Sequence, residues 1–422
     1  MRTGESKWVV LALLSLAIAG NYYAFDSVAP LAGLLHTQRG FSQSQIGLLN
    51  GVIGLPNIAL SLVGGLVIDR FGAARAAVGT AAFCCVGAVL TAIGEPFGVM
   101  VLGRFVFGIG EETLLIALLA GVAQWFAAER AALAMSLLFS LARVGSYMAD
   151  ISPSWASGLY EGGWRPPLWL AAGLTGISFA AALAYWRLDR RRGGVVLGGR
   201  SMWAQMLDIG GFDRSYWYIL TLNVLFASVF FPFRSTFAIA FFQDAKGLSL
   251  PQAGLVNSWV FFTAIFATPV FGRIADRFGH RAMLLTLGAA LMPLTFATLA
   301  ATDWSLWIST MMMGISFSVV PAVIWPATAM LVAPRRLGTA YGLINVLQSA
   351  GMAVCNLAAG WLNDASHAGA HNPGGYLPML WLFGVLATLG FVATALLWAR
   401  ERGPAGHGLN AVIGEREEEL LF

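Results

Sequence analysis

Long apolar segments separated by short polar connections follow one another along almost the whole chain. A bilayer core about 30 Å thick requires roughly 20 apolar residues for each helix that crosses it. At that length, the pattern predicts an all-α membrane protein with twelve transmembrane helices. The predicted spans lie near residues 8–35, 44–68, 75–94, 98–125, 131–158, 166–186, 215–242, 251–271, 281–301, 305–332, 338–362 and 377–399.

Two segments at the ends of these spans recur in the second half of the chain, each at an offset of 207 residues. The sequence FSQSQIGLLN at residues 41–50 aligns with LSLPQAGLVN at residues 248–257. The sequence GGLVIDRFG at residues 64–72 aligns with FGRIADRFG at residues 271–279. A repeat of about half the chain length indicates a duplicated unit, so we expect two pseudo-symmetric six-helix halves.

The longest polar connection, rich in Gly and Arg, follows span six and marks the expected boundary between the halves. We predict an N-terminal six-helix half at residues 1–190, a cytoplasmic linker at 191–213, a C-terminal six-helix half at 214–402 and a cytoplasmic tail at 403–422.

The composition fits a membrane protein and argues against an enzyme. Of 422 residues, 58% are hydrophobic and 11% are charged, and the mean hydropathy is +0.73, which is too apolar for an ordinary soluble domain. Cys84, Cys85 and Cys355 all lie within apolar runs, so neither a disulfide framework nor a metal site is expected. The sequence shows no nucleophile paired with a base, no metal-ligand spacing and no phosphate-binding loop, so we expect no cofactor either.

The basic residues are distributed unequally between the two sides of the predicted membrane protein. Of the 25 Lys and Arg residues, 19 fall on the side of the N-terminus, while Arg39, Arg165 and Lys246 fall on the opposite side. The positive-inside rule therefore predicts that both termini are cytoplasmic.

The three remaining basic residues, Arg104, Arg143 and Arg234, fall inside predicted spans. An ionisable group at that depth must face a partner or a water-filled cavity, which makes each a candidate functional residue. Arg104 lies near the outer end of span four, where snorkelling to the interface is the alternative. Arg234 follows Pro232 deep in span seven, where a broken helix is tolerated against protein or a cavity.

Acidic residues that suit Arg143 lie in two other spans. Span one contains Tyr22 and Asp26, and span four contains Glu111 and Glu112. Consecutive helical residues point about 100° apart, so at most one of the two glutamates is expected to face the cavity of Arg143. Two interpretations stay open: an internal salt bridge between Arg143 and Glu112, or a central site that presents separated opposite charges to a zwitterionic solute.

Proline residues inside the spans predict kinks and close helix approach. The sharpest break is expected at Trp325–Pro326, which makes Trp325 a further candidate for substrate binding. The prolines that interrupt spans are Pro56, Pro153, Pro269, Pro321 and Pro326.

The repeated loop with the pattern Gly-x-x-x-Asp-Arg-x-Gly predicts a contact between the two halves. Its glycines permit positive φ angles, and an Asp at a helix N-terminus contributes about 0.3 to 1 kcal/mol. If that helix belongs to the other half, the loop is a conformational latch that forms only when the cytoplasmic side is closed; the alternative is an ordinary capped turn. The candidate latch residues are Gly65, Asp69, Arg70 and Gly72 in the first copy and Asp276, Arg277 and Gly279 in the second.

With twelve predicted spans, two halves and the doubled loop, the chain resembles the major facilitator superfamily over nearly its whole length, and in that superfamily this loop is a conformational latch. A narrower resemblance, to the family of the lysosomal dipeptide uniporter, rests on several short motifs. They are Ala24-Phe25-Asp26, Arg104-Phe105-Val106-Phe107-Gly108-Ile109-Gly110, Glu111-Glu112-Thr113-Leu114, Ala142-Arg143-Val144-Gly145-Ser146, Trp325-Pro326 and Leu337-Gly338-Thr339-Ala340-Tyr341-Gly342.

The narrower resemblance implies roles for two residues and favours uniport. It implies that Glu112 meets the amino terminus of a dipeptide and that Arg143 meets its carboxylate. Glu111 departs from the family pattern, since it stands where a small residue is more usual, and this bears on pocket size and selectivity. The resemblance also implies that eukaryotic members associate with a glycosylated accessory subunit, for which this sequence shows no site, and the need for one stays open. We expect a monomer.

The leading hypothesis is a secondary or facilitative transporter that moves small zwitterions, dipeptides above all, by alternating access. Because arginine greatly exceeds lysine, we expect a bacterial inner membrane as its location. One alternative is a proton-coupled antiporter that exports drugs or metabolites. Another, of a different class, is a membrane sensor or assembly factor that binds a solute without moving it.

Overall fold

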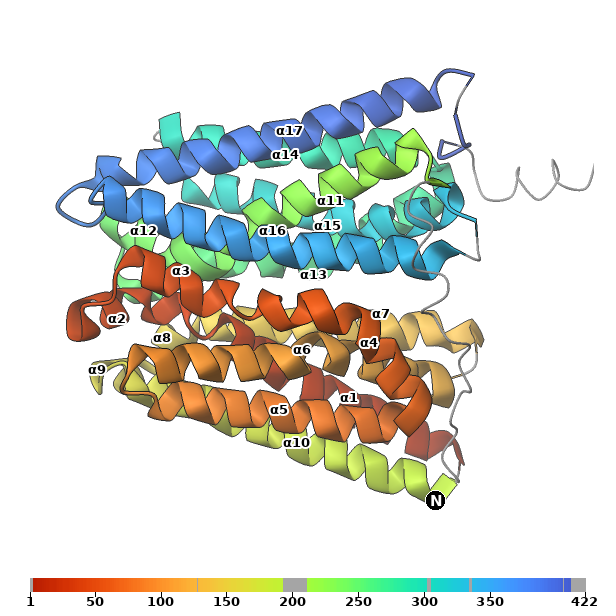
Figure 1. Ribbon diagram of the computed structural model, residues 1–422, viewed down its shortest axis with the longest axis horizontal. Helices are drawn as coiled ribbons and strands as arrows, with labels where there is room; N and C mark the ends of the chain where they lie inside the picture. The colour runs from red at the N-terminus through yellow and green to blue at the C-terminus, as the bar shows by residue number, and fades with distance from the viewer. Residues whose placement is uncertain are drawn as a thin grey trace, which may run out of the picture.

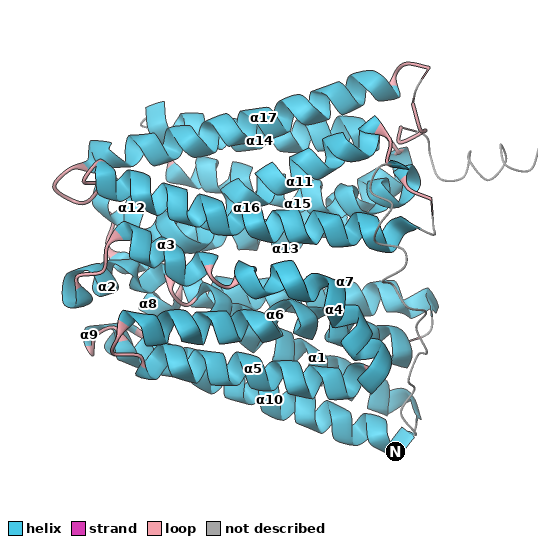
Figure 2. Cartoon of the chain, viewed as in Figure 1, coloured by secondary structure: helices cyan, strands magenta, loops and turns pink. Residues whose placement is uncertain are grey.

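The helices form two bundles that lie side by side, one from each half of the chain (Figure 1). The computed structural model describes residues 3–126, 128–192, 211–301, 305–333, 336–404 and 406–410. Within these ranges the regular elements are helical, and loops and turns join them (Figure 2). The predicted all-α fold is therefore confirmed.

The N-terminal bundle is built around α1, which packs against α7 and α10, while α5 packs against α6 and α10. Its elements are α1 (Thr3–Asp26), η1 (Ala29–Leu31), α2 (Ala32–Arg39), α3 (Gln43–Gly51), α4 (Gly54–Phe71), α5 (Ala73–Ile93), α6 (Phe97–Trp125), α7 (Ala128–Asp150), α8 (Ser152–Trp155), α9 (Ser157–Glu161) and α10 (Arg165–Arg192).

The C-terminal bundle repeats this arrangement with α11, which packs against α16 and α17. Its elements are α11 (Arg214–Pro232), the π-helical turn η4 (Phe233–Phe237), α12 (Ala238–Lys246), α13 (Leu250–Phe278), α14 (Arg281–Ala301), α15 (Leu306–Leu331), α16 (Leu337–Ala365), η6 (Pro373–Tyr376) and α17 (Leu377–Glu401).

Ten helical stretches in the described residues are long and apolar enough to cross a membrane. The other two predicted spans, 44–68 and 131–158, correspond to helices that are interrupted: α3 is followed by α4, and α7 is followed by α8 and α9. Helix α1 begins and α17 ends on the same side of the molecule (Figure 1), which is consistent with twelve crossings. We call this side the terminal side and the opposite one the far side.

Some of the predicted proline interruptions coincide with helix breaks, and others do not. Helix α15 continues through Pro321 and Pro326, so the expectation of a sharp break at Trp325–Pro326 is wrong. Packing against neighbouring helices allows a membrane helix to tolerate proline without ending. The breaks lie between α3 and α4, at Ile151 just before Pro153 of α8, and at the π-helical turn that follows Pro232, the last residue of α11.

The repeat at residues 41–50 and 248–257 has the same local structure in both halves. Gly40 and Gly247 end α2 and α12 with φ of 66° and 68°. In the next turn the backbone N–H of Ser42 donates to Gln45 Oε1 at 2.9 Å, and that of Ser249 donates to Gln252 Oε1 at 3.0 Å. The duplication therefore sets how α3 and α13 begin.

Two glycines of this repeat let the halves approach each other on the far side. A Cβ atom at Gly47 would lie 2.3 Å from the carbonyl oxygen of Asn356 in α16, and one at Gly254 would lie 2.2 Å from that of Asp150 in α7. Both separations are too short for any side chain. Close backbone contact at these two crossings therefore requires glycine.

A hydrogen-bonded cap closes the same side. The carboxylate of Asp364, near the end of α16, accepts hydrogen bonds from the backbone N–H groups of Gln43 and Ser44 at 2.7 and 2.8 Å and from the Ser44 hydroxyl. The C-terminal half thus caps a helix of the N-terminal half. The long helices of the two bundles diverge toward the terminal side (Figure 1), so the halves are joined on the far side.

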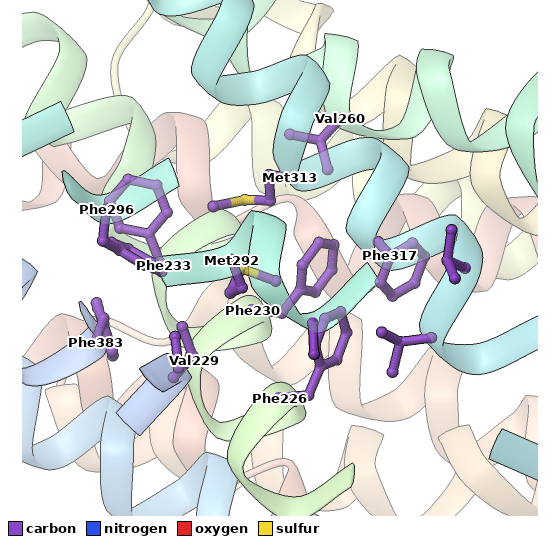
Figure 3. Packing of buried hydrophobic residues seen from close by; sticks show 14 of the residues in the cluster. Phe226, Val229, Phe230, Phe233, Val260, Met292, Phe296, Met313, Phe317 and Phe383 are labelled. Atoms are coloured by element: carbon purple, nitrogen blue, oxygen red, sulfur yellow. The ribbon is translucent and has the colours of Figure 1, made fainter. Parts of the chain in front are cut away.

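The two bundles fill their interiors differently. The core of the N-terminal bundle contains many alanines, among them Ala77, Ala81 and Ala117. The C-terminal core is built from phenylalanines (Figure 3), and the rings of Phe230 and Phe317 stack with centroids 4.1 Å apart. The aromatic core extends to the junction between the halves, where Phe317 meets a side chain of the N-terminal bundle.

Candidate functional site

A buried ion-pair cluster joins the halves at the level of the π-helical turn. The Arg234 guanidinium pairs with Asp26 of α1, with Nη1 2.6 Å from Oδ1, and with the carboxylate of Asp150 in α7. The Asn257 amide donates to Asp150 Oδ1 and to the Arg234 carbonyl, both at 3.1 Å. The ring of Phe261 lies 3.9 Å from the Arg234 Cζ atom.

Asp26 and Arg234, two of the predicted substrate-binding residues, are thus brought together. Their side chains are fully buried, and each comes from a different half of the chain. In a low-dielectric interior, removing one member of such a pair leaves an uncompensated charge. We therefore treat the cluster as a junction between the halves.

Arg143 has a different environment, although it lies nearby in α7. Its Cζ atom is 4.6 Å from the ring centroid of Phe317, 5.2 Å from that of Phe261 and 5.6 Å from that of Tyr22. Its Nη1 atom is buried and has no hydrogen-bond partner among the described residues. The guanidinium is held by aromatic faces from both halves, and these contacts provide no hydrogen-bond acceptor for its Nη1 atom.

Glu112, the predicted counterpart of Arg143, lies in α6 and is partly exposed. Across the described ranges, neither residue forms an ion pair, so the internal salt bridge between Arg143 and Glu112 is wrong for this structure. The physical reason is that the guanidinium stacks on Phe261 and Phe317 of the other half. Tyr22 lies within electrostatic range of both charges and of Glu111.

Glu111 points to a different place from its neighbour. It is 7% exposed and lines a cavity between the halves. Its carboxylate Oε2 is 3.5 Å from the Asn57 amide nitrogen. The two consecutive glutamates therefore have separate surroundings, as expected for neighbouring positions on a helix.

Arg104 is buried and hydrogen-bonded, so the snorkelling interpretation is wrong. Its guanidinium donates to the carbonyls of Leu49, Ala24 and Phe25 at 3.2, 2.9 and 2.7 Å, and to Asn50 Oδ1 at 2.6 Å. These carbonyls lie in the last turns of α1 and α3, where backbone oxygens lack partners within the helix. Arg104 therefore ties both helix ends to α6.

Trp325 lies apart from these charges, toward the terminal end of α15. Its side chain is 36% exposed, its ring packs edge-on against Tyr341, and its carbonyl accepts a hydrogen bond from the Tyr341 hydroxyl at 3.0 Å. Nothing in these contacts joins it to Arg143.

The two copies of the latch loop share their backbone geometry. Gly72 and Gly279 end α4 and α13 with φ of 82° and 64°, a region that favours glycine. The preceding arginines, Arg70 and Arg277, each lie over the ring of the next residue, at 5.6 and 5.4 Å. Gly65 lies in α4, and the side chains of Asp69 and Asp276 lie outside the described residues, so the latch stays a prediction.

The first residues of the predicted tail cover the second latch loop. Leu409 is fully buried. The carbonyls of Leu409 and Asn410 accept hydrogen bonds from the backbone N–H groups of Arg281 and His280 at 3.1 and 3.2 Å. The acidic run at residues 415–419 lies outside the described residues, as does most of the predicted linker 191–213, so the boundaries of the halves also stay a prediction.

The sequence did not single out three residues that complete these environments. Phe261 and Phe317 are two of 28 phenylalanines, and no local pattern separates them from the rest. The repeat did give a sequence signal for Asn257, because this residue aligns with Asn50. The Asn50 amide also donates a hydrogen bond across the junction, to the Ser235 carbonyl at 2.8 Å.

Comparison with known proteins agrees with this architecture. A family model described as Major Facilitator Superfamily matches residues 14–242 and 219–417. The chain belongs to the Major Facilitator Superfamily. This superfamily member is a multi-pass membrane transporter and not an enzyme, since the family and the similar proteins are transporters.

Three similar proteins illustrate its place in the superfamily. The human lysosomal dipeptide transporter MFSD1 is 29% identical over 425 residues, which cover 97% of this chain and 89% of that protein. The nucleoside transporter NupG has a solved structure with a TM-score of 0.72 and 13% identity, covering 92% of this chain and 99% of NupG. A bacterial homologue of the human lysosomal transporter Spinster, in an inward-facing and occupied conformation, gives a TM-score of 0.70 at 16% identity, covering 93% and 96%.

The resemblance to the dipeptide transporter family is thereby confirmed. The two solved structures establish the fold alone, because their sequence identities are low.

Proposed function

We propose that this superfamily member moves dipeptides, or zwitterions of similar size, across the membrane by alternating access. Arg143 binds the substrate carboxylate, and Glu112 binds its amino group. The observation that carries this proposal is the unpaired guanidinium of Arg143, placed deep in the bundle among rings from both halves. Similarity to a human protein named as a lysosomal dipeptide transporter supports it.

Energetics favour a ligand at Arg143. An arginine inside a membrane protein is costly unless it is paired or faces water, and the aromatic rings offset only part of that cost. A carboxylate matches the planar guanidinium and forms strong, charge-assisted hydrogen bonds with it. The carboxylate of the ligand therefore supplies the negative charge that pairs with the Arg143 guanidinium.

Glu112 provides the complementary charge. It is partly exposed, so its carboxylate is accessible to an ammonium group. Tyr22 of α1 interacts electrostatically with both charges, and its ring packs against Phe25. Opposite charges on α6 and α7 suit a molecule with a free amino end and a free carboxyl end.

The contacts around Arg143 support alternating access. Arg143 belongs to the N-terminal half, whereas Phe261 and Phe317 belong to the C-terminal half. A ligand bound at Arg143 therefore lies at the contact between the two halves. The far side is joined by Asp364 and the Arg234 cluster, and transport requires these contacts to open when the terminal side closes. In that second state the candidate latch residues Asp69 and Asp276 form their contacts.

We propose uniport in a bacterial inner membrane, with both termini in the cytoplasm and a monomer as the working unit. The excess of basic residues on the terminal side supports the orientation. Reporter fusions at both ends test it, and activity of a reporter that functions only outside the cytoplasm contradicts it.

The decisive experiment measures ligand binding by thermal shift on the purified protein. Alanyl-alanine is compared with its C-terminal amide and its N-acetyl derivative, because a ligand at 100 times its dissociation constant adds about 2.7 kcal/mol to stability. Alanyl-alanine is expected to stabilise the wild type, and both blocked forms are expected to bind at least tenfold more weakly.

Matched variants assign the two ends of the substrate. Arg143→Met is expected to bind alanyl-alanine much more weakly than the wild type does. Its affinities for the free peptide and for the C-terminal amide are expected to be equal. Glu112→Gln is likewise expected to bind alanyl-alanine more weakly, with equal affinities for the free peptide and its N-acetyl form. Arg165→Met, whose side chain is 43% exposed, is the control and should bind normally. Undiminished affinity in Arg143→Met contradicts the proposed site.

Flux in proteoliposomes then tests uniport. Peptide is expected to equilibrate without accumulating, and accumulation driven by an imposed pH gradient contradicts uniport while leaving the binding site intact.

A further inference from the structure

A small polar cavity lies at the junction of the two halves, where α3 and α4 pack against α16. Its volume is about 30 Å³, which is enough for one or two water-sized groups, since one such group needs about 10 to 15 Å³. Polar residues of both halves line it, namely Asn50, Asn57 and Glu111 from the first half and Ser235, Thr236 and Asn356 from the second.

Two helix interruptions meet at this cavity, one from each half. Helix α3 ends at Gly51 and α4 begins at Gly54, and both glycines line the cavity. In the second half the lining includes the π-helical turn η4, whose Ser235 carbonyl accepts a hydrogen bond from the Asn50 amide at 2.8 Å. Interrupted membrane helices direct backbone carbonyl oxygens away from the regular helix, where they suit small cations. The backbone therefore supplies oxygen atoms at the junction.

Hydrogen bonds hold the neutral side chains of the lining in place. The Asn50 amide also donates to Thr236 Oγ1 at 2.9 Å. The Thr236 hydroxyl donates to Asn356 Oδ1 at 2.7 Å, and the Asn356 amide donates to the Met352 carbonyl at 2.9 Å. This chain of bonds joins α3 to η4 and α16, so the arrangement of the oxygen atoms depends on the contact between the halves.

Glu111 is the charged residue of the lining. It is 7% exposed, its contact with the Asn57 amide is long at 3.5 Å, and in the described chain no basic side chain lies within ion-pair distance of it. Arg104 interacts with it electrostatically but donates its hydrogen bonds to Asn50 and to backbone carbonyls. A buried carboxylate is costly without a compensating charge. The cavity therefore combines such a carboxylate with space for a small cation.

The charged side chains in the interior of the described spans indicate that this cation is monovalent. Their carboxylates exceed their arginines by one. The arginines are Arg104, Arg143 and Arg234, and the carboxylates are Asp26, Asp150, Glu111 and Glu112. One monovalent cation balances this set, whereas a divalent ion leaves it with an excess positive charge.

We propose that this cavity binds a sodium ion that regulates the transporter. The Glu111 carboxylate supplies the charge, and neutral oxygen atoms of the lining, together with water, supply the other ligands. Hard cations of this kind prefer carboxylate, carbonyl and water oxygens. The site does not depend on the proposed peptide substrate, because its residues are separate from Arg143 and Glu112.

The position of the cavity explains why the ion regulates transport and is not carried. Opening of the far side separates α3 from η4 and α16, which takes the lining of the cavity apart. The ion therefore binds one of the two states, the one in which the far side is closed. A ligand that binds a single state shifts the population toward it, so sodium favours the closed far side.

The test is thermal unfolding of the purified wild type without peptide, with choline chloride replaced stepwise by sodium chloride at constant ionic strength. Sodium is expected to raise the melting temperature in a saturable manner, because it binds the folded protein. The larger potassium ion is expected to require about tenfold higher concentrations. Equal effects of the three salts throughout the neutral pH range overturn the proposal, because a proton then neutralises Glu111.

Two adjacent glutamine variants locate the ion. Glu111→Gln is expected to abolish the stabilisation by sodium, and Glu112→Gln, which makes the same chemical change at the next position of α6, is expected to retain it. Glu111→Asp keeps the charge but shortens the side chain, so a weaker sodium dependence is expected even if Glu111→Gln fails to fold. Wild-type sodium dependence in either variant of Glu111 overturns the site.

Flux in proteoliposomes distinguishes regulation from cotransport. With equal sodium on both sides, uptake of alanyl-alanine by the wild type is expected to be at least twofold slower than in choline, whereas Glu111→Gln should show no difference. Peptide accumulation driven by a sodium gradient overturns the regulatory role. This measurement alone rests on the proposed function, and absence of any peptide flux overturns that function while the thermal test still decides the sodium site.

Discussion

Arg143 and Arg234 lie within reach of the same ring, that of Phe261, at 5.2 and 3.9 Å. Arg234 contacts two carboxylates and an amide network, and its side chain is fully buried. The Arg143 guanidinium lies among the rings of Tyr22, Phe261 and Phe317, and its Nη1 atom has no hydrogen-bond partner among the described residues. Two arginines separated by one phenylalanine thus have opposite degrees of pairing. Arg234 joins the two halves, and the missing ion pair at Arg143 supports the proposal that it binds the ligand.

The largest effect that separates them is on stability. Arg234→Met leaves Asp26 and Asp150 buried without their cation, and breaking a buried pair in this way costs about 3 to 5 kcal/mol. Arg143→Met removes no ion pair and should unfold at nearly the wild-type temperature. Thermal unfolding of both variants in the same detergent measures the difference. Equal melting temperatures contradict the distinction between the two arginines.

A smaller effect is expected at Asn257, which supports the Arg234 cluster. Asn257→Ala removes hydrogen bonds to Asp150 and to the Arg234 carbonyl, and a hydrogen bond to a charged group is worth about 1.5 to 3 kcal/mol. Asn257→Ala should lower the free energy of unfolding by less in the Arg234→Met background, because the effects of substitutions within one network are not additive. Additive losses indicate that Asn257 acts independently of the cluster.

Arg143→Lys tests whether ligand binding requires the planar guanidinium of Arg143 or only its positive charge. Lysine keeps the charge but loses the planar donors and the stacking on Phe261 and Phe317. We expect alanyl-alanine to bind about tenfold more weakly, which corresponds to about 1.4 kcal/mol, with no change in melting temperature. Arg39→Lys, at the last residue of α2, is the control. Wild-type affinity in Arg143→Lys shows that charge alone is sufficient.

The smallest effect concerns an ion pair outside the spans. Burial alone would raise the pKa of Asp213, but hydrogen bonds from Ser215, together with His407 and Arg400, hold it below its usual value. A carboxylate with a lowered pKa contributes stability that is present above about pH 4 and lost as the pH falls through its folded-state pKa. Asp213→Asn should therefore cost at most about 1 kcal/mol near pH 7.

A pH series of thermal unfolding checks this value. The difference between wild type and Asp213→Asn should shrink below pH 4, since the Asp213 carboxyl is then protonated and resembles the amide. A difference that stays constant from pH 3 to pH 7 contradicts it.

Sequence patterns predicted the features that depend on local chemistry. Hydropathy located the spans, because each must be apolar over a fixed length. The offset of 207 residues identified the duplication, and the glycines at positions 72 and 279 have the positive φ that the loop pattern implies.

The pairing of the charges depended on information that no local pattern contains. Arg234 and Asp150 are 84 residues apart, and the rotation of their helices decides whether they meet. The π-helical turn at Phe233–Phe237 has no sequence signal stronger than Pro232. Arg104 was open to two interpretations because its partners are mostly backbone carbonyls, which every residue carries.

The close crossings at Gly47 and Gly254 offer a practical route to the opposite conformation. Any larger residue at either position acts as a wedge, since its first carbon atom collides with a carbonyl of the other half at 2.3 or 2.2 Å. The collision penalises the arrangement in which the far side is shut, so a tryptophan at either glycine is expected to bias the molecule toward an arrangement in which the far side is open. Such a variant would allow the conformation with the far side open to be studied by cryo-electron microscopy without an inhibitor.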